Sequence, residues 1–213
     1  MKVLVVQNRM GIGDMVIFLP YIEAISKQLN VPVSLLVKEN TKCLEYLSDN
    51  PYVDKIIILD RDDKTKFGKH YGIKGIFNLA SEIKKYNFDK IFIFNSSFRY
   101  TIVAKLSKIK NIHQYKLFSK KNQNIIETAR MFLKKTLNTE VESNPTISIS
   151  SQKIADAKNK YKIIDDEINI LLGVGGSGPT KRVSPEKFIE FMKLCSNKFK
   201  CKFFLAAGSN KTE

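Results

Sequence analysis

Two glycine-containing loops, each following a short apolar run, carry the residues of this chain that could do chemistry. The first run, Val3–Val6, leads to Gly11 and Gly13, and Asp14 follows at the start of an apolar helical pattern. Ligands of open α/β sheets bind at the carboxyl ends of strands, and glycine lets the backbone approach a ligand closely. Asp14 has two interpretations: the N-cap of the helix, or a general base that takes a proton from an acceptor hydroxyl.

The second loop follows the apolar run Ile168–Leu172 and has the sequence GVGGSGPTKR over residues 173–182. Its glycines expose backbone N–H groups, and its hydroxyl and cationic side chains add hydrogen-bond donors. A loop of this kind, placed before a helix N-terminus, can hold a diphosphate. The alternative is a glycine-rich turn that holds no ligand. The residues predicted to bind a diphosphate are Gly176, Ser177, Thr180 and Lys181.

Neither loop matches the common nucleotide-binding motifs. A dinucleotide fingerprint requires a third glycine where Val16 stands, so an NAD-dependent oxidoreductase is disfavoured. A P-loop requires a lysine directly after its last glycine, and Pro179 occupies that position, which disfavours ATP hydrolysis. Ser184 followed by Pro185 fits an N-cap with proline at the first helical position. The second loop is therefore expected to lead into a helix without being a P-loop.

Short β-branched runs alternate with longer helical patterns, which predicts an α/β protein with parallel sheets. Strands that read as continuous Val, Ile and Leu runs are buried on both faces. The predicted strands are Val3–Val6, Val33–Val37, Ile56–Leu59, Ile91–Phe94, Ile112–Tyr115, Thr146–Ile149, Ile168–Leu172 and Phe203–Ala206. The predicted helices are Met15–Leu29, Thr41–Ser48, Lys74–Tyr86, Arg99–Ser107, Gln123–Leu137, Ser151–Tyr161 and Pro185–Asn197. Pro20 would kink the first helix or mark its true start.

A polar, proline-ended segment, Asn138–Pro145, is the predicted linker, and it divides the chain into domains of residues 1–145 and 146–213. The run Thr146–Ile149 would either close the first sheet or begin the connection. After residue 168 the chain holds a single β-helix-β crossover, and two strands with one helix bury a sheet poorly. We therefore expect that the natural protein continues beyond Glu213 and that the second domain is incomplete.

The composition is typical of a globular protein of the cytosol. Of the 213 residues, 43% are hydrophobic and 27% are charged, which is an ordinary mixture for a folded core. The sequence lacks the roughly 18 consecutive apolar residues of a membrane span, and its first apolar run is too short for a signal peptide. The three cysteines form no CxxC pair, so no metal site is expected. His70 and His113 are interpreted as surface or packing residues and are assigned no role.

Positive charge is concentrated in one part of the chain. Lysine and arginine number 36 against 21 aspartate and glutamate, which gives a net charge of +15. Residues 99–135 hold ten basic residues and one acid, Glu127, and so carry a charge of +9. Such a field attracts polyanions: nucleic acid, phosphorylated lipid or an anionic membrane face. A general abundance of lysine in this chain is the alternative cause.

Three stretches of the chain resemble glycosyltransferase family 9, the ADP-heptose:lipopolysaccharide heptosyltransferases. The first is GIGDMVIFLP at residues 11–20, and the second is FDKIFIFNSSFRYTIVAKL at residues 88–106, in which a strand, a small polar turn and a basic residue lead into a helix. The third, GVGGSGPTKRVSPEKF at residues 173–188, is similar to the family's G-x-S-x-x-x-K-R-x-P-x-x-x-F signature. The sequence departs from that signature at Val183, where the family has an aromatic residue.

The resemblance implies a GT-B architecture, in which two Rossmann-like domains bind the acceptor and the sugar nucleotide respectively; here the second domain would only begin. It implies that Asp14 is the catalytic base, with Gly11 and Gly13 on the acceptor side. Arg99 would help to hold an anionic acceptor, and the polar segment Arg61–Gly72 would also face it. Ser177 and Lys181, with Thr180 and the backbone around Gly176, would bind the donor diphosphate and stabilise the leaving nucleotide.

The function implied by the resemblance is an inverting transfer of a heptose or related sugar. The donor would be a nucleotide-sugar, first of all ADP-heptose, and the acceptor an anionic glycolipid of the lipopolysaccharide-core type. No cofactor or metal is called for, and the enzyme would be cytoplasmic, peripheral to the inner face of the cytoplasmic membrane. The 213 residues alone would lack the part of the family that holds base and ribose.

The alternative function is that of a non-catalytic, basic α/β protein that binds a nucleotide or nucleic acid. The sequence of residues 99–135 contains no RRM, KH or helix-turn-helix signature. Its aromatic residues are as compatible with a core as with stacking on bases. A nucleic-acid partner is therefore not expected.

Overall fold

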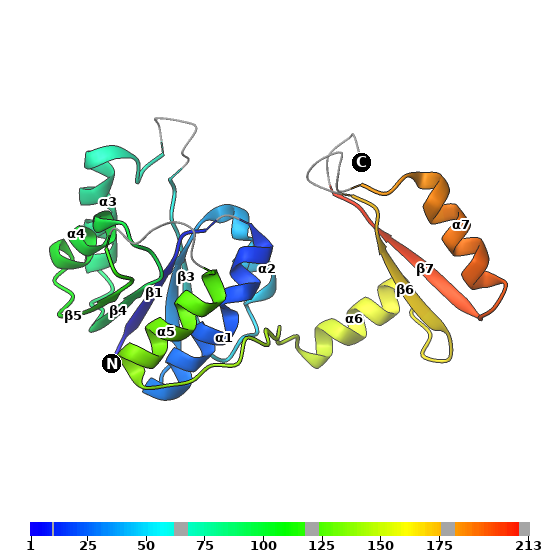
Figure 1. Cartoon of the computed structure of the whole chain (residues 1–213), viewed down its shortest axis with the longest axis horizontal. Coiled ribbons are helices and arrows are strands. Elements are labelled where there is room, and N and C mark those ends of the chain that lie inside the picture. Colours follow the sequence, from blue (N-terminus) through cyan, green and yellow to red (C-terminus); the bar gives the residue numbers. More distant parts are fainter. Residues whose placement is uncertain (10, 62–67, 118–123, 176–181, 209–213) are drawn as a thin grey trace. The chain divides into compact units, whose positions relative to one another are not determined.

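The computed structural model describes residues 1–9, 11–61, 68–117, 124–175 and 182–208, and it divides into two compact units (Figure 1). The first unit is Met1–Ile149 and the second is Ser150–Glu213. The domain boundary expected after residue 145 remains a prediction. Among the helices in the described ranges, none is both long and apolar enough to cross a bilayer.

The first unit is built on a five-stranded parallel sheet with the order β3-β2-β1-β4-β5. Its strands are β1 Val3–Gln7, β2 Val33–Val37, β3 Val53–Ile58, β4 Lys90–Ile93 and β5 Asn111–Gln114. Every residue of β1 and β2 is buried, as expected of strands that helices cover on both faces. The order reverses beside β1, which pairs with β2 on one side and β4 on the other.

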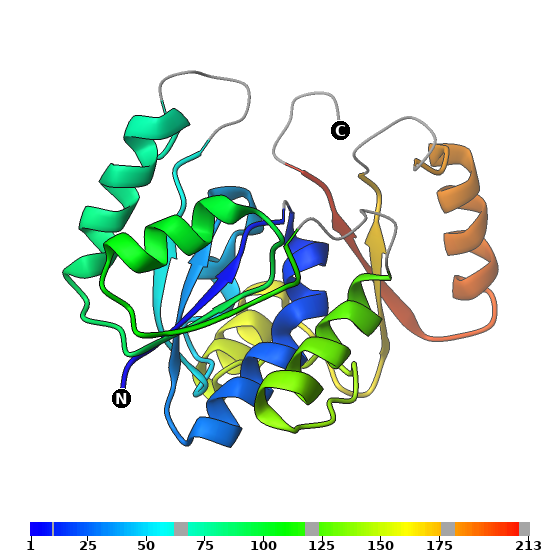
Figure 2. The same cartoon turned by 60° about the vertical axis from the view of Figure 1, so that its left-hand side comes forward.

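Helices cover both faces of this sheet, two on each (Figure 2). Helices α1 Ile12–Leu29 and α5 Ile125–Leu137 pack together on one face. Helices α3 Gly72–Lys84 and α4 Phe98–Leu106 pack together on the other. The α/β doubly wound class predicted from the alternation of runs is therefore confirmed. The short helices η1 Glu39–Thr41 and α2 Cys43–Tyr46 lie between β2 and β3.

Side chains of β1 alternate between the two cores. Val3 and Val5 belong to the core under α1 and α5, and Leu4 and Val6 to the core under α3 and α4. The first core includes aromatic contacts, such as the Phe18 and Phe94 rings with centroids 5.2 Å apart. Full burial of each such side chain stabilises the fold by about 1.5–3 kcal/mol. The sheet therefore holds its polar carboxyl-end loops on a rigid base.

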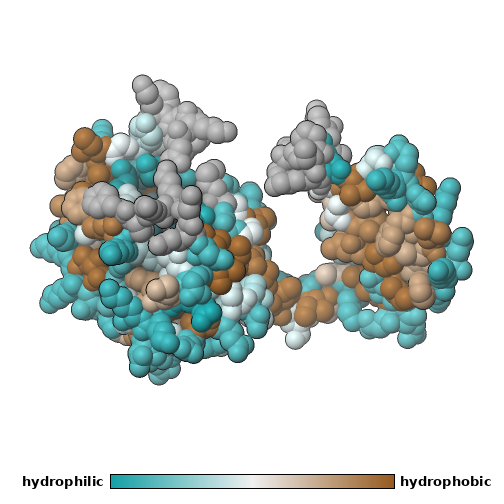
Figure 3. All heavy atoms as spheres, in the orientation of Figure 1, coloured by the Kyte–Doolittle hydropathy of each residue, from teal (hydrophilic) through white to brown (hydrophobic). Residues whose placement is uncertain are grey.

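The second unit consists of helix α6 Ser151–Tyr161, strand β6 Ile168–Gly173, helix α7 Pro185–Ser196 and strand β7 Cys201–Ala206. The strands β6 and β7 pair in parallel. Of its described residues only Leu172 is buried. Apolar side chains are spread over its surface, as Figure 3 shows, and Leu171 and Leu205 are 70% and 62% exposed. As predicted, two strands and their helices bury little of their own apolar surface.

The strand predicted at Thr146–Ile149 is absent from the structure. These residues adopt no strand, and Ile147 and Ile149 are both exposed. An alternating β-branched run becomes a strand only where its backbone finds a ladder partner, so β-propensity alone did not decide the outcome. The segment Thr146–Ile149 neither closes the first sheet nor extends the second.

Two predicted helices differ in detail. Helix α1 begins at Ile12 rather than Met15, and it continues through Pro20, which is buried within it. The helix predicted at Thr41–Ser48 is divided into η1 and α2 by Lys42, whose φ of 54° lies in the left-handed region. A residue in that conformation ends a right-handed helix, because the next turn cannot continue its hydrogen bonds.

The start of α3 gives a test of this packing. A methyl group on Gly75 would overlap the backbone of His70, so we expect Gly75→Ala to reduce the free energy of unfolding by about 1–3 kcal/mol. The control is Gly13→Ala, where the added methyl group would meet nothing within 4 Å. Chemical denaturation followed by circular dichroism measures both. An unchanged midpoint for Gly75→Ala would contradict the packing of α3 on His70.

Candidate functional site

Asparagine side chains join the loops that follow the neighbouring strands β1 and β4. The Nδ2 of Asn95 donates a hydrogen bond of 2.9 Å to Oδ1 of Asn8. The Oδ1 of Asn95 accepts a hydrogen bond of 2.7 Å from the backbone N–H of Ser97, and Ser97 is the N-cap of α4. Strand order reverses between β1 and β4, which is where open α/β sheets bind ligands. Asn95 therefore shapes the edge of the sheet at its switch point.

Gln114, the last residue of β5, extends this network to a third strand. Its Nε2 donates to the carbonyl oxygens of Asn95 at 2.9 Å and Ser97 at 2.8 Å. Its Oε1 accepts a hydrogen bond from the hydroxyl of Thr101 on α4. The ends of β1, β4 and β5 are thus tied together by side-chain amides, which can both donate and accept.

The loop after β1 is held by hydrogen bonds to Gln7, the last residue of that strand, whose side chain is fully buried. Gln7 accepts a hydrogen bond of 2.6 Å from the backbone N–H of Arg9 and donates one of 3.3 Å to the carbonyl of Asp14. Gly11 is the N-cap residue of α1 and has a φ of +95°, a conformation that favours glycine. Space in front of Gly13 is open, since an added methyl group there would meet nothing within 4 Å.

Asp14 is not the N-cap of α1, so that interpretation is wrong. The N-cap is Gly11, and Asp14 lies within the first turn of the helix, half-buried. Among the described residues, none forms a hydrogen bond or ion pair with the Asp14 carboxylate. Negative charge in the first turn is favourable because the N–H groups of a helix N-terminus point toward it. The general-base interpretation therefore remains for this side chain.

Arg99, in the first turn of α4, is held by backbone carbonyls. Its Nη1 donates to the carbonyl of Gly72 at 2.8 Å, and its Nη2 donates to the carbonyl of His70. Its Nε is buried and lacks a partner among the residues that the structure describes. Burial lowers the pKa of Arg99, and the nearby positive charge of Arg61 lowers it further. Arg61 and Arg99 thus act on each other as like charges, an interaction that a bound anion would relieve.

The buried side chain of Tyr100 lies against the same cations. Burial raises the pKa of the Tyr100 hydroxyl, while the charges of Arg61 and Arg99 and the amide of Asn8 oppose that rise. The hydroxyl does not reach hydrogen-bond geometry with a described residue. Its surroundings nevertheless place Asn8, Arg61 and Arg99 around one ring. Residues from the ends of β1 and β3 and from the start of α4 therefore converge here.

The predicted acceptor-side residues lie at this edge of the first sheet. Gly11, Gly13 and Asp14 follow β1, and Arg99 follows the neighbouring strand β4. The predicted diphosphate residues Gly176, Ser177, Thr180 and Lys181 lie outside the described residues. They fall between the end of β6 at Gly173 and the start of α7 at Pro185.

The amide network of Asn8, Asn95 and Gln114 was not predicted from the sequence. Their position was the available signal, since each is a polar residue at or just after the end of an apolar run. Short polar side chains are common in turns for local reasons, so that signal could not separate a network from ordinary turn residues.

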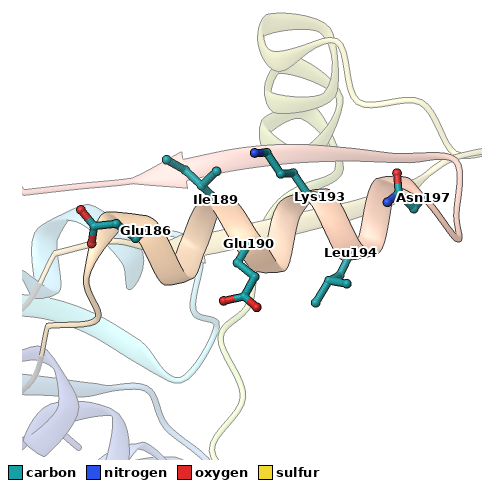
Figure 4. Close-up of a pocket in the computed structure, with 6 residues that line it drawn as sticks. All are labelled: Glu186, Ile189, Glu190, Lys193, Leu194 and Asn197. Atoms are coloured by element: carbon teal, nitrogen blue, oxygen red, sulfur yellow. The ribbon is translucent and has the colours of Figure 1, made fainter.

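Two of the hollows in the described surface differ in their linings. One of about 640 Å³ begins at Gln114 and continues between the end of β5 and α5, with Lys116 and Lys135 among its lining residues. The other lies along α7 (Figure 4), and all six residues that line it belong to that helix or follow it directly. A hollow with one helix as its wall holds no convergent polar groups of the kind that binding sites use.

The fold is similar to that of solved glycosyltransferases. A glycosyltransferase family 9 protein of Veillonella parvula has a TM-score of 0.67 at 17% identity, covering 99% of this chain and 70% of that one. The ADP-heptose LPS heptosyltransferase II of E. coli has a TM-score of 0.66 at 16% identity, covering 96% and 64%. The E. coli heptosyltransferase WaaC with ADP-2-deoxy-2-fluoro heptose has a TM-score of 0.64 at 18% identity, covering 98% and 70%.

These similarities confirm the expected resemblance at the level of the fold: a Rossmann-like parallel sheet followed by a second, small parallel sheet. The chain spans between 64% and 70% of the lengths of these three structures. No protein-family model matches the sequence, and no curated protein matches it either. At identities below 20%, these similarities show the fold alone, and the chemistry must be argued from the residues of the site.

The amide network can be tested by Asn95→Ala, which removes two hydrogen bonds and leaves Asn8 without its partner. We expect the free energy of unfolding to fall by about 1–3 kcal/mol. The matched control is Asn111→Ala at the opposite end of the sheet, where an exposed amide makes one bond of 3.4 Å. Thermal and chemical denaturation of both variants measure the difference. Equal effects would show that the network does not fix this edge.

Proposed function

We propose that this protein is a glycosyltransferase that moves a heptose or related sugar from a nucleotide-sugar to an anionic glycolipid. ADP-heptose is the first donor to test. The observation that carries this proposal is the position of Asp14, Arg61 and Arg99 at one sheet edge: a half-buried carboxylate after β1, and two guanidinium groups that follow β3 and β4 and act on each other as like charges. The first supplies a base for a hydroxyl, and the second supplies counter-charge for an anionic acceptor.

The acceptor is proposed to bind at the edge of the sheet where Arg61 and Arg99 supply positive charge. Arg99 is paired with carbonyl oxygens of His70 and Gly72, which orient the guanidinium without neutralising its charge. A phosphate or carboxylate could accept hydrogen bonds from such a group in a fixed direction. The basic stretch at residues 99–135 would add attraction to a membrane surface that carries acidic lipids, consistent with a peripheral location on the cytoplasmic face.

The proposed chemistry is a single displacement with inversion. Asp14 takes the proton of the acceptor hydroxyl as that oxygen forms a bond to the anomeric carbon. The bond between this carbon and the diphosphate oxygen breaks, and the nucleoside diphosphate leaves with the electron pair. The open space in front of Gly13 supports this assignment, because it allows an acceptor to approach the helix start beside Asp14.

The donor diphosphate is proposed to bind the loop that contains Gly176, Ser177, Thr180 and Lys181. The carboxyl end of β6 precedes this loop, and the N-terminus of α7 follows it, with Ser184 as N-cap and a proline at its start. Helix N-termini favour phosphate through their N–H groups and dipole. WaaC, whose fold is similar, has been solved with ADP and with an ADP-heptose analogue. Lys181 would offset the charge that develops on the leaving group.

The role of Asp14 is tested by Asp14→Asn, which preserves shape and removes the base. We expect the transfer rate from ADP-heptose to fall by about a hundredfold to ten-thousandfold, with the circular dichroism spectrum unchanged. The matched control is Glu23→Gln on the same helix, where the carboxylate pairs with Lys27, and its rate should stay near that of the parent. A parent-like rate for Asp14→Asn would exclude Asp14 as the base.

Donor binding is tested by calorimetric titration with ADP and UDP. We expect ADP to bind and Lys181→Ala to weaken it about tenfold or more, as for loss of one charged hydrogen bond. Lys198→Ala, an exposed lysine just before β7, is the control and should bind as the parent does. Equal binding by all three proteins would remove Lys181 from the donor site. Binding of single-stranded nucleic acid with steep salt dependence, and of neither nucleotide, would favour the alternative function.

A further inference from the structure

His70 is a buried histidine with an unusually complete set of contacts. It lies just before α3 and is 1% exposed. Its backbone N–H donates to the carbonyl of Asp60 at 2.9 Å, and its ring Nδ1 accepts from the backbone N–H of Asp60 at 3.1 Å. Both bonds fasten the chain after β3 to the chain before α3. The packing role expected from sequence is thus only part of what this side chain does.

The contact with Asp60 decides the protonation state of the ring. An Nδ1 that accepts from a backbone N–H carries no proton, so the proton of the neutral imidazole is on Nε2. The Nε2 lies 3.3 Å from Oε2 of Glu82 and donates to it. Glu82 also pairs with Lys69 at 2.5 Å. The geometry therefore fixes His70 as a neutral imidazole in one tautomer.

The backbone of His70 orients the proposed anion site. Its carbonyl accepts from Nη2 of Arg99, and the carbonyl of Gly72 accepts from Nη1. Arg61 directly follows Asp60, the residue that the His70 ring holds. His70 thus contacts Asp60, the residue before Arg61, and also binds the guanidinium of Arg99 through its carbonyl. Gly75 brings α3 so close to the His70 backbone that a methyl group would not fit, which leaves the carbonyl little room to move.

We propose that His70 is a positioning residue that holds Arg61 and Arg99 in the geometry for an anionic acceptor only while its ring is neutral. This inference rests on the proposed function of the two arginines. Protonation of Nδ1 would replace the acceptor with a second donor facing the Asp60 N–H, so that bond would be lost. Asp60 and Arg61 would then be held near the start of α3 only through the backbone N–H groups of Lys69 and His70, which bind Asp60, and anion binding would weaken as pH falls.

The charges around the ring come from three elements. Glu82 on α3 and Asp60 after β3 favour the protonated ring, Lys69 beside it disfavours it, and the guanidinium of Arg99 on α4 binds its carbonyl. Burial is the largest effect and lowers the pKa of His70 below the ordinary value of 6.5, against the opposing charges of Glu82 and Asp60. The ring is therefore neutral at neutral pH, where the proposed site is assembled.

The same shift makes stability depend on pH in a defined direction. The folded-state pKa lies below the unfolded value, so the unfolded chain binds more protons between the two. The contribution of His70 to stability is fully present above its pKa in the unfolded chain, near 6.5. It declines as pH falls from there toward the pKa in the folded protein. Above pH 7, titration of His70 adds almost nothing to the dependence of stability on pH.

The first test follows the Asp60 amide and the His70 ring by nuclear magnetic resonance from pH 7.5 to 5.0, using the full chain. We expect the Asp60 amide resonance to shift, and its exchange with solvent to speed up, with the same midpoint as the His70 ring. This readout needs no substrate and no activity. If the ring titrates while the Asp60 amide keeps its chemical shift and its protection from exchange, the proposed positioning role of His70 is overturned.

Two matched variants separate positioning from packing. His70→Asn places an amide oxygen near the position of Nδ1 and cannot titrate, whereas His70→Gln reaches toward Glu82 and leaves Asp60 N–H without its acceptor. Sulfate is the anionic probe, because it keeps its double negative charge throughout this pH range. We expect the parent to bind sulfate about tenfold more weakly at pH 5 than at pH 7.5, as for loss of one charged hydrogen bond.

The variants should then differ from the parent in opposite ways. His70→Asn should bind sulfate at pH 5 as well as at pH 7.5, and His70→Gln should bind it weakly at both. An added positive charge alone would tighten sulfate binding at low pH, so tighter binding by the parent would overturn the inference, as would equal binding by the two variants. Absence of sulfate binding in every protein would instead contradict the proposed anion site. The Asp60 amide measurement would still test whether protonation of His70 breaks its contact with Asp60.

Discussion

The pairing of β1 with β2 on one side and β4 on the other is the constraint on which the rest of this structure depends. All five residues of β1 are buried, as expected of a strand that has neighbours on both sides and helices over both faces. Parallel pairing then brings the carboxyl ends of β1 and β4 to one edge while their helices leave toward opposite faces. The loops must diverge there, and the Asn8 and Asn95 side chains bridge the space between them.

Electrostatics at this edge follow from how the cations are held. Arg99 is oriented by two carbonyl oxygens, which use its donors without removing its charge, and Arg61 adds a second positive charge nearby. Arg61 and Arg99 thus lie at the same edge of the sheet as the half-buried carboxylate of Asp14, and burial lowers the pKa of Arg99. This arrangement of charges suits the proposed acceptor, an anion whose hydroxyl must lose a proton.

The sheet of the second unit is less well covered than that of the first. Its two parallel strands pair over their whole length, yet Leu171, Leu205 and Leu194 remain largely exposed. A parallel strand pair is ordinarily covered on both faces, and here neither α6 nor α7 has a buried residue. The first unit, with four helices over five strands, shows what full coverage looks like in the same chain.

The sequence by itself located the strands that the two sheets contain, because burial leaves a local record: continuous apolar runs that end at polar residues or glycine. It located Asp14, Gly11 and Arg99 at strand ends, and it found most helices to within a few residues. Tertiary structure alone decided that Gly11 and not Asp14 caps α1, that Thr146–Ile149 is no strand, and that His70 supports Arg99. Each of these depends on contacts between segments far apart in the chain, such as Asn8 with Asn95 across 87 residues. Local periodicity cannot encode them, since strand order chooses which loops become neighbours.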